Sequence, residues 1–112
     1  MGSRINFVFD DGTDALTVLY SHYGETTWEE DLSAALHHAM PRQNSEEYFT
    51  RMIISYLIKD QLLDETGFGI YAVKRDELSD FADKVVVLDF VTKTVTDLDN
   101  QKSIPFYSEV LV

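Results

Sequence analysis

The segment Leu19–Gly24 holds the densest group of polar and aromatic side chains in the sequence. Within it, His22 lies between Tyr20 and Tyr23. A histidine in this setting can act as a general base, donate a hydrogen bond to an anion or bind a metal. The simpler interpretation is a structural histidine bonded to a nearby carbonyl. Because the segment joins a predicted strand to a predicted helix, it lies in the kind of loop where α+β domains place ligands.

A second candidate is the segment Glu65–Gly69, in which two glycines flank a phenylalanine. Glycine lets a ligand approach the backbone closely, and exposed amides next to Thr66 and Gly67 can hold a phosphate or a carboxylate. The segment matches neither a P-loop nor a dinucleotide-binding motif. The plainer interpretation is that Gly67 ends a helix in the left-handed conformation.

The third candidate is Arg51, the only cation between Arg42 and Lys59 and part of a strongly apolar predicted helix. Its guanidinium requires a partner, which is either Glu47 one turn earlier or an anionic ligand. Taken together, the three features predict a binding site for a small anionic or nucleotide-like ligand. The predicted ligand-binding residues are Tyr20, His22, Tyr23, Arg51, Thr66 and Gly67.

No catalytic or metal-binding signature accompanies these candidates. Ser21 and His22 are too close in sequence to indicate a triad, and no nucleophile-elbow motif occurs. The chain has no cysteine, which removes thiolate chemistry and disulfides. His37 and His38 are adjacent, so on a helix they point about 100° apart and do not chelate one metal. We predict no catalytic residues, no cofactor and no metal; an enzyme working through His22 is the lowest-ranked alternative.

The charge balance restricts the possible partners. Twenty Asp and Glu face nine Lys and Arg, for a net charge of −11. Such a chain repels phosphate backbones and anionic lipid, so we predict no direct nucleic-acid binding and no membrane binding. The acidity either keeps the protein soluble or presents a surface to a basic partner, at the extreme as a nucleic-acid mimic. Acidic residues gather in 25–31 and in 76–83, away from the predicted ligand site.

The sequence also predicts where the protein resides and how it is divided. The first residues lack the charged and apolar regions of a signal peptide, and no apolar run is long enough to span a bilayer. We therefore expect a cytoplasmic protein. The 112 residues carry apolar side chains along their whole length, which predicts one compact domain over residues 1–112.

Periodicity places these candidates on secondary-structure elements. Alternating apolar residues predict strands, whereas apolar residues at helical spacing predict helices. The first helix is expected to open at Thr26 or Thr27, each of which forms a capping box, and to end before Pro41. The predicted order is a strand over 4–9, a strand over 15–20, a helix over 26–40, a helix from 44 or 45 to about 63, strands over 69–73, 84–91 and 95–98, and a last strand or short helix over 104–111.

This order, β-β-α-α-β-β-β, predicts an α+β fold in which an antiparallel sheet carries both helices on one face. The second helix is apolar on two sides. One stripe contains Phe49, and the other contains Ile54, Ile58 and Leu62. A helix of this kind is buried on two sides. The second stripe therefore either packs inside the domain or forms a homodimer interface.

The chain resembles a family of small uncharacterised proteins that are common in bacteriophage genomes and also occur in actinobacteria. The resemblance rests on the segments Leu19–Gly24, Tyr48–Ile54, Glu65–Ile70 and Val85–Asp89, in this order. Tyr23 stands where the family has tryptophan. The family carries no established activity, but the resemblance implies a phage or prophage setting and a polar cluster built from these segments.

These observations lead to one main hypothesis and one alternative. The main hypothesis is a non-enzymatic, phage-encoded binding protein that interferes with a defence system in the host cytoplasm. It would do so by binding a small anionic ligand or by covering a host protein. The alternative is an acidic interaction module or nucleic-acid mimic that binds a basic partner.

Overall fold

The computed structural model describes residues 4–22, 27–80, 84–99 and 101–107. It confirms the α+β class and the predicted order of elements. The strands are β1 (Ile5–Asp10), β2 (Ala15–Ser21), β3 (Phe68–Lys74), β4 (Lys84–Asp89), β5 (Thr94–Asp97) and β6 (Lys102–Pro105). The helices are α1 (Trp28–Ala39) and α2 (Glu46–Leu57), with short 3-10 turns η1 (Met40–Arg42), η2 (Lys59–Gln61) and η3 (Arg75–Asp80).

The sheet is mixed, which corrects the prediction of a purely antiparallel sheet. Its six strands lie in the order β3-β2-β1-β4-β5-β6. All neighbours are antiparallel except β1 and β4, which run parallel from Ile5 opposite Lys84 to Asp10 opposite Asp89. The reason is topological: β4 does not form a hairpin with β3, because β2 and β1 lie between them. The chain must therefore cross two strands, and β4 enters beside β1 in the same direction.

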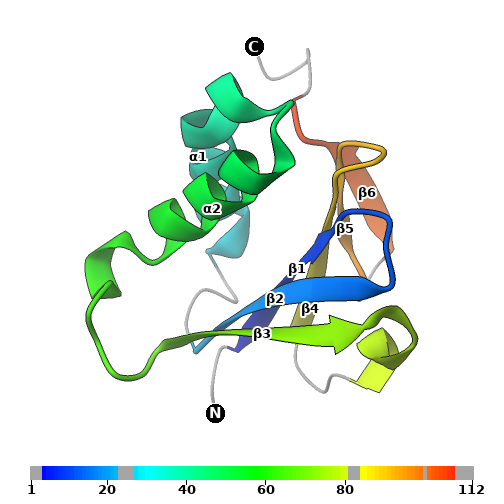
Figure 1. The fold of residues 1–112 in the computed structure, drawn as a ribbon. Helices are drawn as coiled ribbons and strands as arrows, with labels where there is room; N and C mark the ends of the chain where they lie inside the picture. Colours follow the sequence, from blue (N-terminus) through cyan, green and yellow to red (C-terminus); the bar gives the residue numbers. More distant parts are fainter. Residues whose placement is uncertain (1–3, 23–26, 81–83, 100, 108–112) are drawn as a thin grey trace.

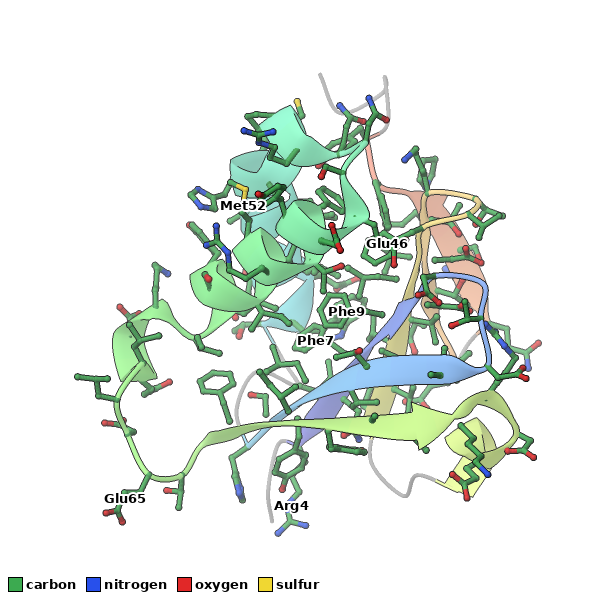
Figure 2. The ribbon with its side chains drawn as sticks, in the orientation of Figure 1. Arg4, Phe7, Phe9, Glu46, Met52 and Glu65 are labelled. Carbon is green, nitrogen blue, oxygen red and sulfur yellow. The ribbon has the colours of Figure 1, made fainter. Side chains whose placement is uncertain are left out.

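Both helices cover one face of the sheet (Figure 1). Phe7 and Phe9 of β1 point toward them (Figure 2), and they join α1 and α2 in one apolar core. Five apolar residues of α1 recur at helical spacing along its sequence, and all five are buried: Trp28, Leu32, Ala35, Leu36 and Ala39. From α2, Phe49 and Ile53 are buried in the same core.

The central strands are buried on both faces. Along β1, Phe7 and Phe9 belong to the helix-side core, whereas Val8 belongs to a second cluster with Leu16, Val18, Val85 and Val87. Successive side chains of a strand point to opposite faces, so this second cluster lies on the sheet face away from the helices. Burial on both sides explains why β4 reads as an uninterrupted apolar run.

Several element boundaries differ from the predicted ones. Helix α2 ends at Leu57 rather than near residue 63, and η2 continues the chain. Gly67 has the expected positive φ of 105°, but it directly precedes β3 and does not end the helix. Thr27 is the N-cap of α1 without a side-chain cap bond; its hydroxyl donates to Asp31 Oδ2 at 3.1 Å instead. No helix in the described residues combines the length and apolar character needed to cross a membrane.

Candidate functional site

A groove runs between α2 and the strands β2 and β3, on the helix side of the sheet. Its larger hollow, of 330 Å³, is lined by Asp11, Glu46, Glu47, Arg51 and Ile70, among others. A second hollow, of 210 Å³, shares Ile70 with the first and continues along η2 and the segment before β3. We call these two adjoining hollows the α2–β3 groove.

The groove exists because the helix layer does not extend over the β3 edge of the sheet. On the helix side, Leu19 of β2 is fully buried, whereas Ala15 and Thr17 of the same strand are exposed. Ile70 of β3 remains 60% exposed and Leu62 after η2 remains 63% exposed. In the larger hollow, β2 and β3 therefore contribute the small side chains of Ala15 and Thr17 together with Ile70, and α2 forms the wall.

Carboxylates dominate the charge of the larger hollow. Glu46 begins α2 and lies near Phe9 of β1 (Figure 2), and Asp11 reaches the hollow from the turn between β1 and β2. Burial and the neighbouring Asp11 carboxylate raise the pKa of Glu46. The hydrogen bonds from Thr13 lower the pKa of Asp11. Asp11 therefore stays ionised to a lower pH than Glu46 does. Two carboxylates in this arrangement repel each other, and a nearby cation relieves that repulsion.

Of the predicted site residues that the structure describes, Arg51 is the one that lies in the larger hollow. It is exposed, and its Nη1 donates to Ser55 Oγ at 3.2 Å. The salt bridges found among the described residues do not include one with Glu47, the partner considered from the sequence. Its guanidinium therefore stands beside an excess of carboxylates rather than in a cationic site.

The other predicted residues lie elsewhere. The phenol of Tyr20 is 3.4 Å from His22 Nε2, and their rings meet edge to face at 5.1 Å. The amide of His22 donates to the carbonyl of Gly67 at 2.9 Å, while Thr66 lines the smaller hollow of the groove. Tyr23 falls outside the described residues. The structure thus brings Tyr20, His22 and Gly67 together.

Tyr20 and Arg51 lie on different sides of the sheet. Tyr20 alternates with Leu19, which belongs to the helix-side core, so its side chain lies on the face away from α2. A single small ligand would have to reach both faces to contact the whole predicted set. Ligand binding by that set stays a prediction.

Sequence reasoning missed the groove carboxylates. Asp11 lies in the turn between β1 and β2, where its carboxylate accepts a hydrogen bond from the Thr13 amide at 3.0 Å. Glu46 begins a helix, as acidic residues commonly do. Each has a sufficient local explanation, so no local signal indicates that the fold brings them to one groove.

Two ion pairs outside the groove hold the ends of strands. Arg75 donates to both oxygens of Asp10, at 2.8 and 2.6 Å, and to the carbonyl of Thr13 at 2.6 Å. This pair ties the end of β3 to the turn between β1 and β2. Lys84 donates to Asp97 at 2.8 Å and Asp99 at 3.3 Å, at the start of β4. The Lys84 pair joins the neighbouring strands β4 and β5, whereas the Arg75 pair connects the ends of β3 and β1, on either side of β2. Both pairs have a structural role.

The predicted acidic clusters lie partly outside the described residues. Glu29, Glu30 and Asp31 are exposed on the first turn of α1, where they complement the helix dipole. Asp76 and Glu77 are exposed in η3. Neither group lines the α2–β3 groove. Within the described residues, no cluster of three or more His, Cys, Asp and Glu side chains is arranged to hold a metal ion.

Comparison of the chain with protein-family models, curated proteins and solved structures found no match. The fold and the groove define the class of protein. It is an α+β protein with a mixed sheet and an acidic, partly apolar groove beside an edge strand.

Proposed function

We propose that the protein is a non-enzymatic binding protein whose α2–β3 groove takes a basic segment of a partner protein. One observation carries this proposal: Asp11, Glu46 and Glu47 line the same hollow as the apolar side chains of Ile54 and Ile70. Carboxylates above an apolar floor complement a segment that combines apolar residues with Lys or Arg. The net charge of −11 draws such a segment toward the protein.

The groove favours this function over the capture of a small anion. Its larger hollow has three carboxylates against the single guanidinium of Arg51, and an anion there meets net repulsion. The resemblance to phage proteins extends the proposal to its setting. The partner is then a protein of the bacterial host, bound in the cytoplasm, and the consequence is interference with a host defence system.

The test measures the binding of a labelled synthetic peptide by fluorescence anisotropy. The peptide has about nine residues, the length of a long strand, with isoleucine and lysine at alternate positions on one side and threonine on the other. We expect binding at about 50 mM salt that weakens strongly at about 500 mM salt, because exposed charges are screened.

A pair of matched variants separates the groove from the overall charge. The Glu46→Gln/Glu47→Gln variant removes two charges from the groove, and the Glu29→Gln/Glu30→Gln variant removes two from the exposed start of α1. We expect the groove variant to lose about tenfold in affinity and the α1 variant to lose less than about twofold. Equal losses mean that the peptide responds only to net charge, and this result overturns the proposal.

A further inference from the structure

The hydrogen bonds at the two ends of β3 show in which direction the N–H and C=O groups of each of its residues point. The amide of Arg75 donates to the carbonyl of Asp14 at 2.8 Å, and the carbonyl of Gly67 accepts from His22 at 2.9 Å. Both pairs continue the register between β3 and β2. In an antiparallel pair, the residues that exchange hydrogen bonds alternate along the strand. The odd-numbered residues of β3 therefore direct their N–H and C=O groups toward β2.

The even-numbered residues of β3 direct theirs away from the sheet. Lys74 confirms this direction, because its amide donates to the Glu77 carboxylate at 3.3 Å rather than to β2. In the described part of the chain, no hydrogen bond occupies the outward amides of Ile70 and Ala72. These two residues present a pair of N–H and C=O groups to a further strand.

This open edge adjoins the groove. Ile70 and Ala72 lie opposite Leu19 and Thr17 of β2, so their side chains stand on the helix side of the sheet. Ile70 lines both hollows of the groove. A strand paired to β3 would therefore place every second side chain beside the groove.

We propose that the partner segment binds as an extended strand added to the β3 edge, an inference that rests on the proposed function. The segment exchanges backbone hydrogen bonds with Ile70 and Ala72. One of its apolar side chains covers Ile70 next to Leu62. The next side chain on that face, about 7 Å further along, is a Lys or Arg that extends over the small side chains of β2 toward Glu46.

The charge of the protein favours such a segment over a second copy of the chain. A copy paired through β3 would bring another net charge of −11 against the first, and like charges oppose association. The homodimer predicted through Ile54, Ile58 and Leu62 would use the same region, because all three line the groove. The homodimer and the peptide would therefore compete for the same region, and the experiments below distinguish them.

The experiment follows amide hydrogen exchange by NMR, with the lysine–isoleucine peptide described above as the probe. In the protein alone, we expect the amides of Ile70 and Ala72 to exchange quickly. At saturating peptide, their exchange should slow at least about tenfold. The amides of Tyr71 and Val73 already point to β2, so theirs should change little. Slowing that does not alternate along β3 overturns the proposed mode.

Two variants test the same hydrogen bonds by affinity. Ala72→Pro removes the outward N–H, and proline is tolerated at edge positions whose N–H faces solvent. Ala72→Ser keeps the N–H and is the control. We expect about a tenfold weaker peptide affinity for Ala72→Pro and less than about a twofold change for Ala72→Ser. A peptide methylated on alternate backbone nitrogens provides the same test without changing the protein, in case Ala72→Pro does not fold.

The outcomes separate this inference from the proposed function. If the peptide binds and the Glu46→Gln/Glu47→Gln variant weakens it, but backbone methylation has no effect, the function stands and strand addition is wrong. If the peptide does not bind at all, both are wrong. If light scattering shows a dimer that Ala72→Pro separates into monomers, the occupant of the edge is a second copy and the inference is overturned.

Discussion

The two edges of the sheet are built in opposite ways. Strand β3 is seven residues long and has neither charge nor proline between Gly69 and Val73. Strand β6 is four residues long and contains Lys102 and Pro105. Short length, lysine and proline are the features by which natural proteins prevent an edge strand from pairing with another chain. By this criterion β6 is protected, and β3 is open.

Backbone direction sharpens the difference. The amide of Phe106 donates to the carbonyl of Lys93 at 2.8 Å, in register with the pairing of β5 and β6. The even-numbered residues of β6 therefore face β5, and Ser103 and Pro105 face outward. Proline has no N–H, so Pro105 offers no donor at its outward position, whereas Ala72 offers one on β3. An edge accepts a partner according to which residues stand at its outward positions, not merely because it is an edge.

The cores behind the two edges differ as well. Beside β6, Phe106 is only 7% exposed, and its ring lies 5.6 Å from Phe49 and 5.8 Å from Phe90. Beside β3, Ile70 is largely exposed. The closed edge is anchored in the core, whereas the open edge leaves an apolar side chain in the groove.

Removing the aromatic anchor of the closed edge should have the largest effect. Phe106→Ala leaves a cavity between Phe49 and Phe90, and we expect a loss of about 3–4 kcal/mol in the free energy of unfolding, measured by urea denaturation. Ile104→Ala is the control, because Ile104 is mostly exposed, and it should lose less than about 1 kcal/mol. Equal losses would contradict the assignment of Phe106 as the anchor.

Amide exchange should distinguish the edges in the protein alone. We expect the outward amides of Ile70 and Ala72 to exchange at least about a hundredfold faster than those of Tyr71 and Val73, because only the latter pair with β2. On the closed edge, the amide of Phe106 should be protected by its bond to Lys93. Uniform protection along β3 would show that its edge is covered.

The ion pair at the end of β3 should appear in the pH dependence of stability. The hydrogen bond from Arg75 lowers the pKa of Asp10 below the ordinary value of 3.8, although burial opposes it. Ionised Asp10 therefore stabilises the folded protein above that value, and the contribution is lost as the pH falls through the lowered pKa. We expect Asp10→Asn to reduce the melting temperature near neutral pH and to approach the wild type in acid.

The control for this prediction is Asp60→Asn. Asp60 Oδ2 lies 4.0 Å from Lys59 Nζ, and both side chains are exposed. Removing this carboxylate should therefore leave the melting temperature almost unchanged. A constant difference between Asp10→Asn and the wild type at all pH values would assign the effect to packing rather than to charge.

The smallest effect on stability is expected at the open edge itself. Ile70→Ser should change the free energy of unfolding by less than about 0.5 kcal/mol, because its side chain is mostly exposed already. The same variant should weaken binding of the lysine–isoleucine peptide. A large loss of stability, measured by the same urea denaturation, would mean that Ile70 supports the fold rather than a partner.

Local patterns predicted most elements because they report burial directly. The five residues of the α1 stripe recur at helical spacing, and all are buried. The alternation predicted the first two strands, and in the structure they pair with each other from Ile5 opposite Ser21 to Phe9 opposite Thr17. The end of α2 was less predictable, because the apolar pattern continues to Leu63, a residue that is almost fully exposed.

Contacts between distant segments were beyond the reach of these patterns. Arg75 and Asp10 are 65 positions apart, and no pattern of a few residues relates them. Likewise, the strand pattern of β4 is the same whether it pairs with β3 or with β1. Of the predicted ligand residues, Tyr20, His22 and Gly67 lie together because two neighbouring strand ends carry them, whereas Arg51 lies with the groove carboxylates.

The sequence by itself determined the α+β class, the order of the elements, the buried face of α1 and the strong negative charge. These properties depend on composition and on periods of a few residues, which burial imposes locally. Only the tertiary structure decided that β4 lies parallel to β1, that Asp11 meets Glu46, and that β3 is an edge with its outward amides beside a groove. These features depend on which strands become neighbours, and this is settled when the whole chain packs its core.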